Sequence, residues 1–342
     1  MEFWEIFRIE RMRVDSALTQ ALWSRWDAEA MAFVFPWGHM IPSLEDVSRI
    51  TGLRVYGKPV SGFTYPCYHD LAERLLELPI ERRSSLVPRV ALQASLGLYE
   101  AGKSAGESED EYLERLVRVS RRELASEPGA EADMDLHRFL ILLLRRLLFA
   151  TRGDAVHCHF LPLLEDLSEV GGYAWGAAFL AHQFDSLDAS ERQNSTSGFF
   201  PFLQVVWQPY LGEGDEGQPW LVQARPYFGR SVWLHALNLA LPLHLYHSQR
   251  SLGLRQSVVE FPVCDRFRRL GRSFQGLHDT TDWHERAKEQ IDNWERRGKA
   301  VKSDATTDDA YLQAYAFEVD VAGEIASLRA LLYSVVQNRE VA

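Results

Sequence analysis

The chain has 342 residues and a formal net charge of −11, and 46% of its residues are hydrophobic. This composition supplies a substantial core and excludes a largely disordered chain. The acidic balance argues against capture of DNA or RNA by the surface as a whole, because an acidic body repels backbone phosphates. Three cysteines, far apart and odd in number, predict reduced thiols in a cytosolic or nuclear protein. The apolar runs are too short to cross a bilayer, so we expect no membrane association.

The first predicted elements are a helix and a β-hairpin. A helix ending near residue 26 is indicated by one stripe of apolar residues: Val14, Leu18, Leu22 and Trp26. Phe33 and Phe35 then stand two residues apart, directly before the turn residues Pro36-Trp37-Gly38. This pattern predicts a hairpin over residues 33–41.

A capped helix and a second hairpin follow. Ser43, with Asp46 three residues later, forms a capping box in its Asp variant and opens a helix that ends at Gly52. Residues 54–60 are rich in turn formers around Gly57-Lys58-Pro59, and they predict a second small hairpin.

The middle of the chain is predicted to be helical. Helices are expected over residues 67–78, 90–99, 110–124 and 134–151. The last of these is apolar around most of its circumference, which is typical of a helix with neighbours on most sides. Residues 160–181 predict two further helices, of which the first starts near Pro162 and runs to Val170. Gly171-Gly172 ends it, and the second begins at residues 173–175.

The last third of the chain is also predicted to be helical. The expected helices cover residues 232–252, with a kink at Pro242, then 283–294 and finally 310–337. Strand-like runs never alternate with helices, which disfavours a Rossmann-type sheet. The predicted fold is therefore all-α, a mainly helical single compact domain with small β-hairpins near the N-terminus. Its core covers residues 1–298, a linker 299–309, and a C-terminal helix 310–342 that folds back onto the same domain or, alternatively, reaches out to another chain.

A pattern typical of phosphate-binding loops, GxxxxGK[ST], is matched by Gly97, Gly102, Lys103 and Ser104. Such a loop needs a buried strand before it and small residues that let backbone N–H groups surround the phosphates. Here the preceding residues predict a helix, and the bulky Leu98 and Tyr99 fall inside the loop. We prefer a helix end followed by a surface loop, and a nucleotide-hydrolysing enzyme is our third hypothesis.

Histidines offer a weak metal-binding pattern. His244 and His247 would lie one turn apart on the predicted helix 232–252, where they could contribute two metal ligands. No carboxylate or cysteine stands at a matching spacing, so a structural role is preferred. We predict no catalytic residue, metal or cofactor.

The densest basic cluster has two phenylalanines interleaved and consists of Arg266, Arg268, Arg269 and Arg272. Such a cluster can contact nucleic acid or an acidic partner, although a solvated, salt-bridged face is the blander interpretation.

Three blocks of the sequence together resemble the plant mobile domain, a module of meristem-maintenance proteins and of many plant transposon reading frames. The first block spans residues 33–62 and carries the resemblance at Phe35, Pro36, Gly38, Leu44, Asp46, Val47, Gly52, Leu53, Gly57 and Pro59. The second spans residues 138–150. The third, residues 160–181, is the most specific, with Leu161, Pro162, Leu163, Leu164, Glu165, Asp166, Leu167, Tyr173, Trp175 and Gly176.

Most of these motif residues are predicted to be core and turn residues, because apolar residues at helical spacing are usually core. Trp37 is the exception, since a tryptophan at a turn tip is often an exposed interface anchor. Two departures from the family pattern also bear on binding: His39 replaces an acidic residue, and Trp207-Gln208-Pro209 replaces Trp-Glu-Arg. The predicted partner-binding residues are therefore Trp37, His39, Trp207, Arg266, Arg268, Arg269 and Arg272.

The resemblance implies a non-catalytic protein-interaction module of the nucleus, with a cytosolic location as the alternative. It also implies a role in transposon silencing, gene expression and genome stability, and a phosphatase-like partner of the plant type-7 class. A transposon-derived nucleic-acid-binding factor is the second hypothesis, since the family occurs in mobile elements and the chain has a basic cluster.

Overall fold

The computed structural model describes residues 16–28, 30–35, 38–78, 80, 85–96, 129–149, 156–192, 202–203, 221–249, 251–252, 261–263, 280–297 and 299–301. Several predictions lie outside these residues. They are the helices 110–124 and 310–337, the phosphate-loop pattern at 97–104, Trp37, Trp207 and the basic cluster at 266–272.

The N-terminal part forms a helix followed by a three-stranded antiparallel sheet. Helix α2 (Ser16–Trp23) leads into β1 (Trp26–Asp27), β2 (Ala32–Phe35) and β3 (Gly38–Met40), which lie in that order in the sheet. The predicted hairpin is confirmed as β2 and β3. The first helix ends before Trp26, because that residue joins β1 opposite Phe33, and its indole Nε1 donates a buried hydrogen bond of 2.7 Å to Asp188.

Most of the predicted helices in the described residues are confirmed. They are α3 (Leu44–Thr51), α4 (His69–Leu76), α5 (Arg89–Ser95), α7 (Ala130–Leu143), α9 (Trp175–Arg192) and α11 (Trp283–Arg297). Helix α7 continues as a short π-helix (Leu144–Leu148).

The predicted helix before the Gly171-Gly172 pair is much shorter than expected. Helix α8 covers only Leu161–Leu164, and a 3₁₀ turn (Val170–Gly172) follows. The Asp166 carboxylate accepts hydrogen bonds from the backbone N–H and hydroxyl of Ser168, at 2.9 and 2.6 Å. Short polar side chains compete with helix hydrogen bonds in this way, and the apolar spacing alone does not reveal it.

The predicted helix over residues 232–252 is wrong. The chain forms a hairpin of β7 (Ser231–Ala236) and β8 (Leu239–His244), then a 3₁₀ turn (Leu245–Ser248). Every residue of β8 is buried, and a continuous apolar run fits a buried strand as well as a buried helix. Leu237-Asn238 forms the two-residue turn, with Leu237 at a positive φ of 56°. Pro242 lies inside β8 opposite Trp233, so it is a strand residue and does not kink a helix.

The second predicted hairpin, over residues 54–60, is also wrong. This segment makes isolated parallel bridges to distant parts of the chain, Lys58 with Tyr173 and Val60 with Ala236. We call residues 54–60 the connector. It pairs with the residues before α9 and with the end of β7, whereas a hairpin would pair the segment with itself.

The remaining strands are short and pair across long sequence distances. Strand β4 (Phe63–Thr64) pairs with β10 (Thr281–Asp282), β5 (Leu86–Val87) with β6 (Val156–His157), and β9 (Phe261–Val263) with β11 (Lys299–Val301). A short helix, α10 (Leu221–Ala224), precedes β7. Strand β11 occupies the first three residues of the predicted linker 299–309. The described fold is thus mainly helical with small antiparallel sheets, and the all-α prediction is correct only in part.

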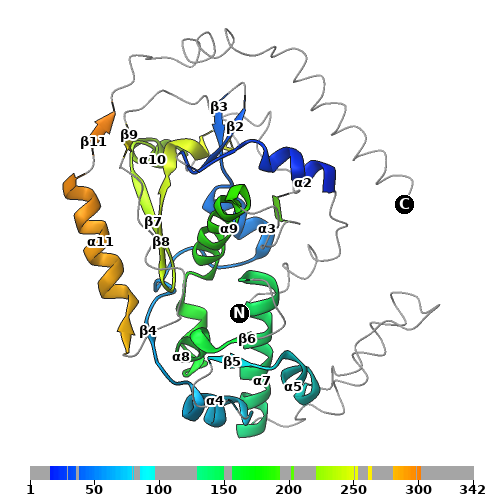
Figure 1. The fold of residues 1–342 in the computed structure, drawn as a ribbon. Helices are drawn as coiled ribbons and strands as arrows, with labels where there is room; N and C mark the ends of the chain where they lie inside the picture. The colour runs from blue at the N-terminus through cyan, green and yellow to red at the C-terminus, as the bar shows by residue number, and fades with distance from the viewer. Residues whose placement is uncertain are drawn as a thin grey trace.

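Helix α9 lies at the centre of the core. It packs against α3 on one side and the β7–β8 hairpin on the other (Figure 1). Trp175, Phe179 and Phe184 on α9 are buried, and one hydrophobic cluster joins residues from Trp26 to Leu243. Among the described residues, every helix is too short or too polar to span a membrane.

Candidate interaction site

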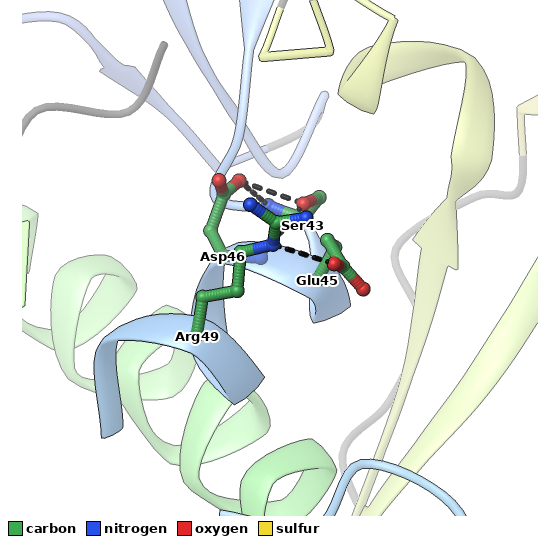
Figure 2. Close-up of polar contacts among 4 residues, drawn as sticks. All are labelled: Ser43, Glu45, Asp46 and Arg49. Carbon is green, nitrogen blue, oxygen red and sulfur yellow. Dashed lines mark hydrogen bonds and ion pairs between the residues drawn. The ribbon is translucent and has the colours of Figure 1, made fainter. Parts of the chain in front are cut away.

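The first motif block contains helix α3, whose first residues form a hydrogen-bonded cap. The Ser43 hydroxyl accepts the backbone N–H of Asp46 at 3.0 Å, and the Asp46 carboxylate accepts the Ser43 N–H and hydroxyl, both at 2.7 Å (Figure 2). The predicted capping box is therefore confirmed. Burial raises the pKa of Asp46 to about 6, although the hydrogen bonds from Ser43 oppose that shift. Helix α3 then ends at Gly52, which has a left-handed φ of 70°, as predicted.

The connector that follows α3 is bonded directly to the third motif block. Gly176 N–H donates to the Arg54 carbonyl, Lys58 N–H to the Gly172 carbonyl, and Ala174 N–H to the Lys58 carbonyl, each at 2.8 Å. The two motif blocks that carry most of the resemblance thus form one structural unit, although residues 63–159 lie between them in the sequence. We call residues 54–58 and 165–176 the motif junction.

Two glycines allow the backbones to approach this closely. Gly57 has φ 123°, and a Cβ there would lie 2.3 Å from the Gly172 carbonyl oxygen. A Cβ on Gly176 would lie 2.8 Å from a methyl group of Val55. Larger residues at either position would separate the two blocks.

An exposed aromatic residue stands on the outer side of the motif junction. Tyr56 is 68% exposed, more than any other large hydrophobic side chain in the described residues. The Arg54 guanidinium lies 4.4 Å from the centre of its ring and donates a hydrogen bond of 3.0 Å to the Gly171 carbonyl. A cation held over a ring restrains both side chains before any partner binds. This pair resembles the pre-ordered aromatic and arginine anchors of protein interfaces.

Three ion pairs lie on the elements around the Arg54–Tyr56 pair. Lys58 is paired with Glu169, and Arg74 on α4 is paired with Glu165. On α3, Arg49 is paired with Glu45 at 2.7 Å, as Figure 2 shows. All six side chains are exposed, so these pairs add little to stability. Of the four cations named here, Arg54 alone has no acidic partner among the described residues, and the exposed Asp166, hydrogen-bonded by Ser168, adds a negative charge to the motif junction.

Most of the other motif residues lie in the core or in turns. Leu161, Leu163, Leu164, Leu53, Val47, Phe35 and Trp175 are buried. The Trp175 indole donates to the Val170 carbonyl at 2.8 Å, which satisfies its polar atom inside the core. Pro162, Leu44, Leu167, Tyr173 and Pro59 are half-buried, whereas Glu165 and Asp166 are exposed.

Among the predicted partner-binding residues, only His39 falls within the described part of the chain. It lies on β3, with its ring centre 5.1 Å from that of His247, and burial lowers its pKa. His39 therefore belongs to a packed histidine group rather than to the motif junction. The sequence analysis does not predict Tyr56 or Arg54 as site residues. The one available signal is an aromatic residue directly before Gly57-Lys58-Pro59, a segment for which a hairpin is predicted.

The histidines do not form the predicted pair on one helix. His244 ends β8, and His247 lies in the following 3₁₀ turn, with ring centres 5.7 Å apart. The Ser231 hydroxyl lies 2.7 Å from Nδ1 of His244, and Nε2 of His247 bonds the Tyr246 hydroxyl. Within the described ranges, no three His, Cys, Asp or Glu side chains converge as metal ligands do.

The cysteines in the described ranges are free thiols, with Cys67 exposed and Cys158 buried. Burial raises the pKa of Cys158 to about 12, so its thiol is protonated at neutral pH and is a poor nucleophile.

Fold and site together define a mainly helical module with an exposed arginine–tyrosine pair at the junction of two sequence blocks. The plant mobile domain model matches residues 2–225, and the chain belongs to the plant mobile domain family.

Named relatives come from Arabidopsis thaliana. The chain is 31% identical over 206 residues to Protein MAIN-LIKE 2, covering 59% of this chain and 28% of the relative. It is 30% identical over 199 residues to Protein MAINTENANCE OF MERISTEMS, covering 57% and 37%. It is 30% identical over 209 residues to a serine/threonine-protein phosphatase 7 long form homolog, covering 59% and 14%. The chain thus spans less than two fifths of each relative's length. No solved structure matches the chain.

Proposed function

We propose that this chain is a non-catalytic protein-interaction module that acts in the nucleus with a phosphatase-like partner of the type-7 class. Its biological role would be transposon silencing and the control of gene expression. The observation that carries the proposal is the exposed Arg54–Tyr56 pair, which lies where the two most family-like blocks are bonded together. Family features that specify the fold also hold this pair in place.

The relatives support the choice of partner. A similar region makes up 14% of a protein named as a serine/threonine-protein phosphatase 7 long form homolog. In that relative, a module of this kind is part of a protein with a phosphatase name. Domains that share a chain in one protein commonly act together as separate chains in another. On this basis we assign the partner class.

The test is affinity capture from plant nuclear extract with the tagged full-length chain, followed by mass spectrometry. We expect a phosphatase-like protein to be enriched, and Tyr56→Ala to reduce its recovery about tenfold, because removing an aromatic interface anchor that contributes about 1.4 kcal/mol weakens binding by that factor. Tyr227→Ala is a matched control, since Tyr227 is also exposed and also lies under an arginine, Arg230. Capture of no phosphatase-like protein by the wild-type chain would refute the proposed partner.

Localisation is tested separately by imaging a fluorescently tagged chain in plant cells. The proposal expects the signal to concentrate in nuclei. A signal excluded from nuclei would contradict the nuclear role while leaving the interaction test intact.

A further inference from the structure

A small, mainly apolar cavity opens beside Tyr56, and Trp233 and His235 are among its lining residues. Its volume is about 190 Å³, and its lining includes Leu44, Val55, Pro59, Ala177, Val232 and Leu234. Tyr56 and Val232, which also line it, are 68% and 38% exposed, so the cavity reaches the protein surface. An apolar cavity of roughly 150 Å³ can hold a molecule the size of benzene. The space therefore suits one branched aliphatic or aromatic side chain.

The fold keeps this cavity open. The connector after α3 is held to β7 at one end by the Val60–Ala236 bridge and drawn toward Tyr173 by the Lys58 bridge. The connector and β7 both contribute lining residues to the cavity. Gly57, Ala174 and Ala177 also line it and have little or no side chain to fill it. The cavity is therefore preformed, and an occupant would pay little to create it.

Within the described part of the chain, Arg54, whose guanidinium lies over the cavity-lining Tyr56 ring, has no ion pair with a carboxylate. Arg49, Lys58 and Arg74 each have an acidic partner. Arg54 contacts only the Tyr56 ring and the Gly171 carbonyl among its described partners. Its guanidinium has five N–H donors, so donors remain for an incoming carboxylate. Charge complementarity at Arg54 favours an acidic group next to an apolar one.

We propose that this cavity and the Arg54–Tyr56 pair form a docking site for an acidic peptide segment of a partner protein. One apolar side chain of that segment, the size of leucine, enters the cavity beside Val232. A neighbouring carboxylate binds Arg54, and the Tyr56 ring covers the peptide backbone between them. The inference deepens the proposed function by naming what the motif junction binds.

The probe is the synthetic peptide Gly-Ser-Glu-Leu-Glu-Ser-Gly, and its binding to the full-length chain is followed by saturation-transfer NMR. We expect the leucine methyl groups to receive the strongest saturation. Replacing the leucine by alanine should weaken binding about tenfold or more, because most of the buried apolar area is lost. Replacing both glutamates by lysines should also weaken it about tenfold, through repulsion by Arg54. These changes are made in the peptide, so they leave the folding of the protein untouched.

Variants of the protein locate the site. Val232→Phe should block the cavity mouth and abolish the leucine signal, and an aromatic residue is well tolerated on a strand. Arg54→Ala should remove the preference for glutamate over lysine. Arg230→Ala, at the matched arginine–tyrosine pair, should bind the peptide like the wild-type chain. Melting curves verify that each variant is folded.

Equal binding of the leucine and alanine peptides, or binding unchanged in Val232→Phe, would overturn the docking site. Its failure is distinguishable from failure of the proposed function. If the peptide fails while a phosphatase-like protein is still captured from extract, the partner binds elsewhere. If the peptide binds at this site and no phosphatase-like protein is captured, the docking site stands and the partner class is wrong.

Discussion

Among single residues, Gly57 must be glycine for two reasons: its positive φ and its close approach to the Gly172 carbonyl. Its φ of 123° is unfavourable for any residue with a side chain, and an added Cβ would lie 2.3 Å from the Gly172 carbonyl oxygen. We expect Gly57→Ala to lower the free energy of unfolding by about 2–4 kcal/mol, from backbone strain together with separation of the motif junction. Urea denaturation of the full-length chain measures this difference.

Gly171 provides the matched control on the opposite side of the same junction. A Cβ there meets no atom within 4 Å. We expect Gly171→Ala to change stability by less than about 0.5 kcal/mol. If the two alanine variants have equal stability, the close approach at Gly57 is not a constraint.

Buried histidines should make the protein sensitive to acid. Burial lowers the pKa of His244 from 6.5 to about 4, and it also lowers that of His247 and of His39, where Asp27 opposes the shift. The same direction holds for His157, His159 and His235. A histidine with a lowered pKa stabilises the fold fully above pH 6.5, and this contribution is lost as the pH falls toward its folded-state pKa. Asp46 acts in the opposite direction, since its raised pKa favours the fold as the pH falls through 6.

Six histidines outweigh one carboxyl group, so we expect the melting temperature to fall between pH 7 and pH 5. His244 alone accounts for about 3 kcal/mol across its full shift. His244→Asn, whose amide can replace Nδ1 toward Ser231, should show a smaller decrease with pH than the wild-type chain. Calorimetry at the two pH values decides this, and a melting temperature that rises on acidification would contradict it.

At the scale of elements, the cap of α3 contributes more than the ion pair on its surface. Ser43→Ala removes the acceptor for the Asp46 N–H and leaves a buried carboxylate with one donor fewer. We expect a loss of about 2 kcal/mol in the free energy of unfolding. Glu45→Gln breaks the exposed pair with Arg49 on the same helix and should cost less than about 1 kcal/mol. Chemical denaturation compares the two variants. An equal decrease in the free energy of unfolding would show that the capping box contributes no more than the surface ion pair.

Elements with a distinctive local signal could be predicted from the sequence. Ser43, Asp46 and Gly52 specify both ends of α3, and Trp283 with Ala287 marks the buried side of α11. These patterns depend on backbone groups within one turn of helix, so no distant residue is needed to interpret them.

Elements that depend on distant partners could not be predicted in the same way. The run from Val232 to His244 is apolar at most positions, so its periodicity does not separate a helix from a buried strand. The covering helix α9 favours the strand pair, because it provides a broad apolar surface for both strands. Likewise, Tyr56 becomes a site residue only because the connector bonds to residues 172–176. No pattern within residues 54–60 indicates that pairing.

At the scale of the whole molecule, the core extends beyond the segment that defines the family. The family match ends at residue 225. The β7–β8 hairpin lies after that point, yet Leu234, Leu241 and Leu243 belong to the same hydrophobic cluster as Trp175. Leu237 N–H also bonds the Val60 carbonyl at 2.7 Å. Val232 and Leu234, which line the proposed docking cavity, likewise lie outside the family match.

Helix α11 also lies beyond the family match and packs on the same part of the fold. Trp283 is buried, its backbone N–H donates to the Gly62 carbonyl at 3.0 Å, and its indole donates to the Thr64 hydroxyl at 2.7 Å. Its ring packs with Ala240 of β8. One side chain thus connects the end of the first motif block with the hairpin and α11.

The extent of the fold is tested by comparing a fragment of residues 1–225 with the full-length chain. We expect the fragment to aggregate or to unfold without cooperativity, because removing the hairpin exposes the apolar face of α9 that β7 and β8 cover. In the full-length chain, Trp283→Ala should cost about 3–5 kcal/mol, as for other buried aromatic side chains. Arg286→Ala is its control, since Arg286 is exposed and only stacks on the Trp283 ring at 5.4 Å, so its loss should cost less than about 1 kcal/mol. Thermal unfolding followed by circular dichroism and light scattering measures all three. A soluble fragment that melts cooperatively near the full-length temperature would show that the family segment folds alone, and the hairpin and α11 would then be additions to a complete domain.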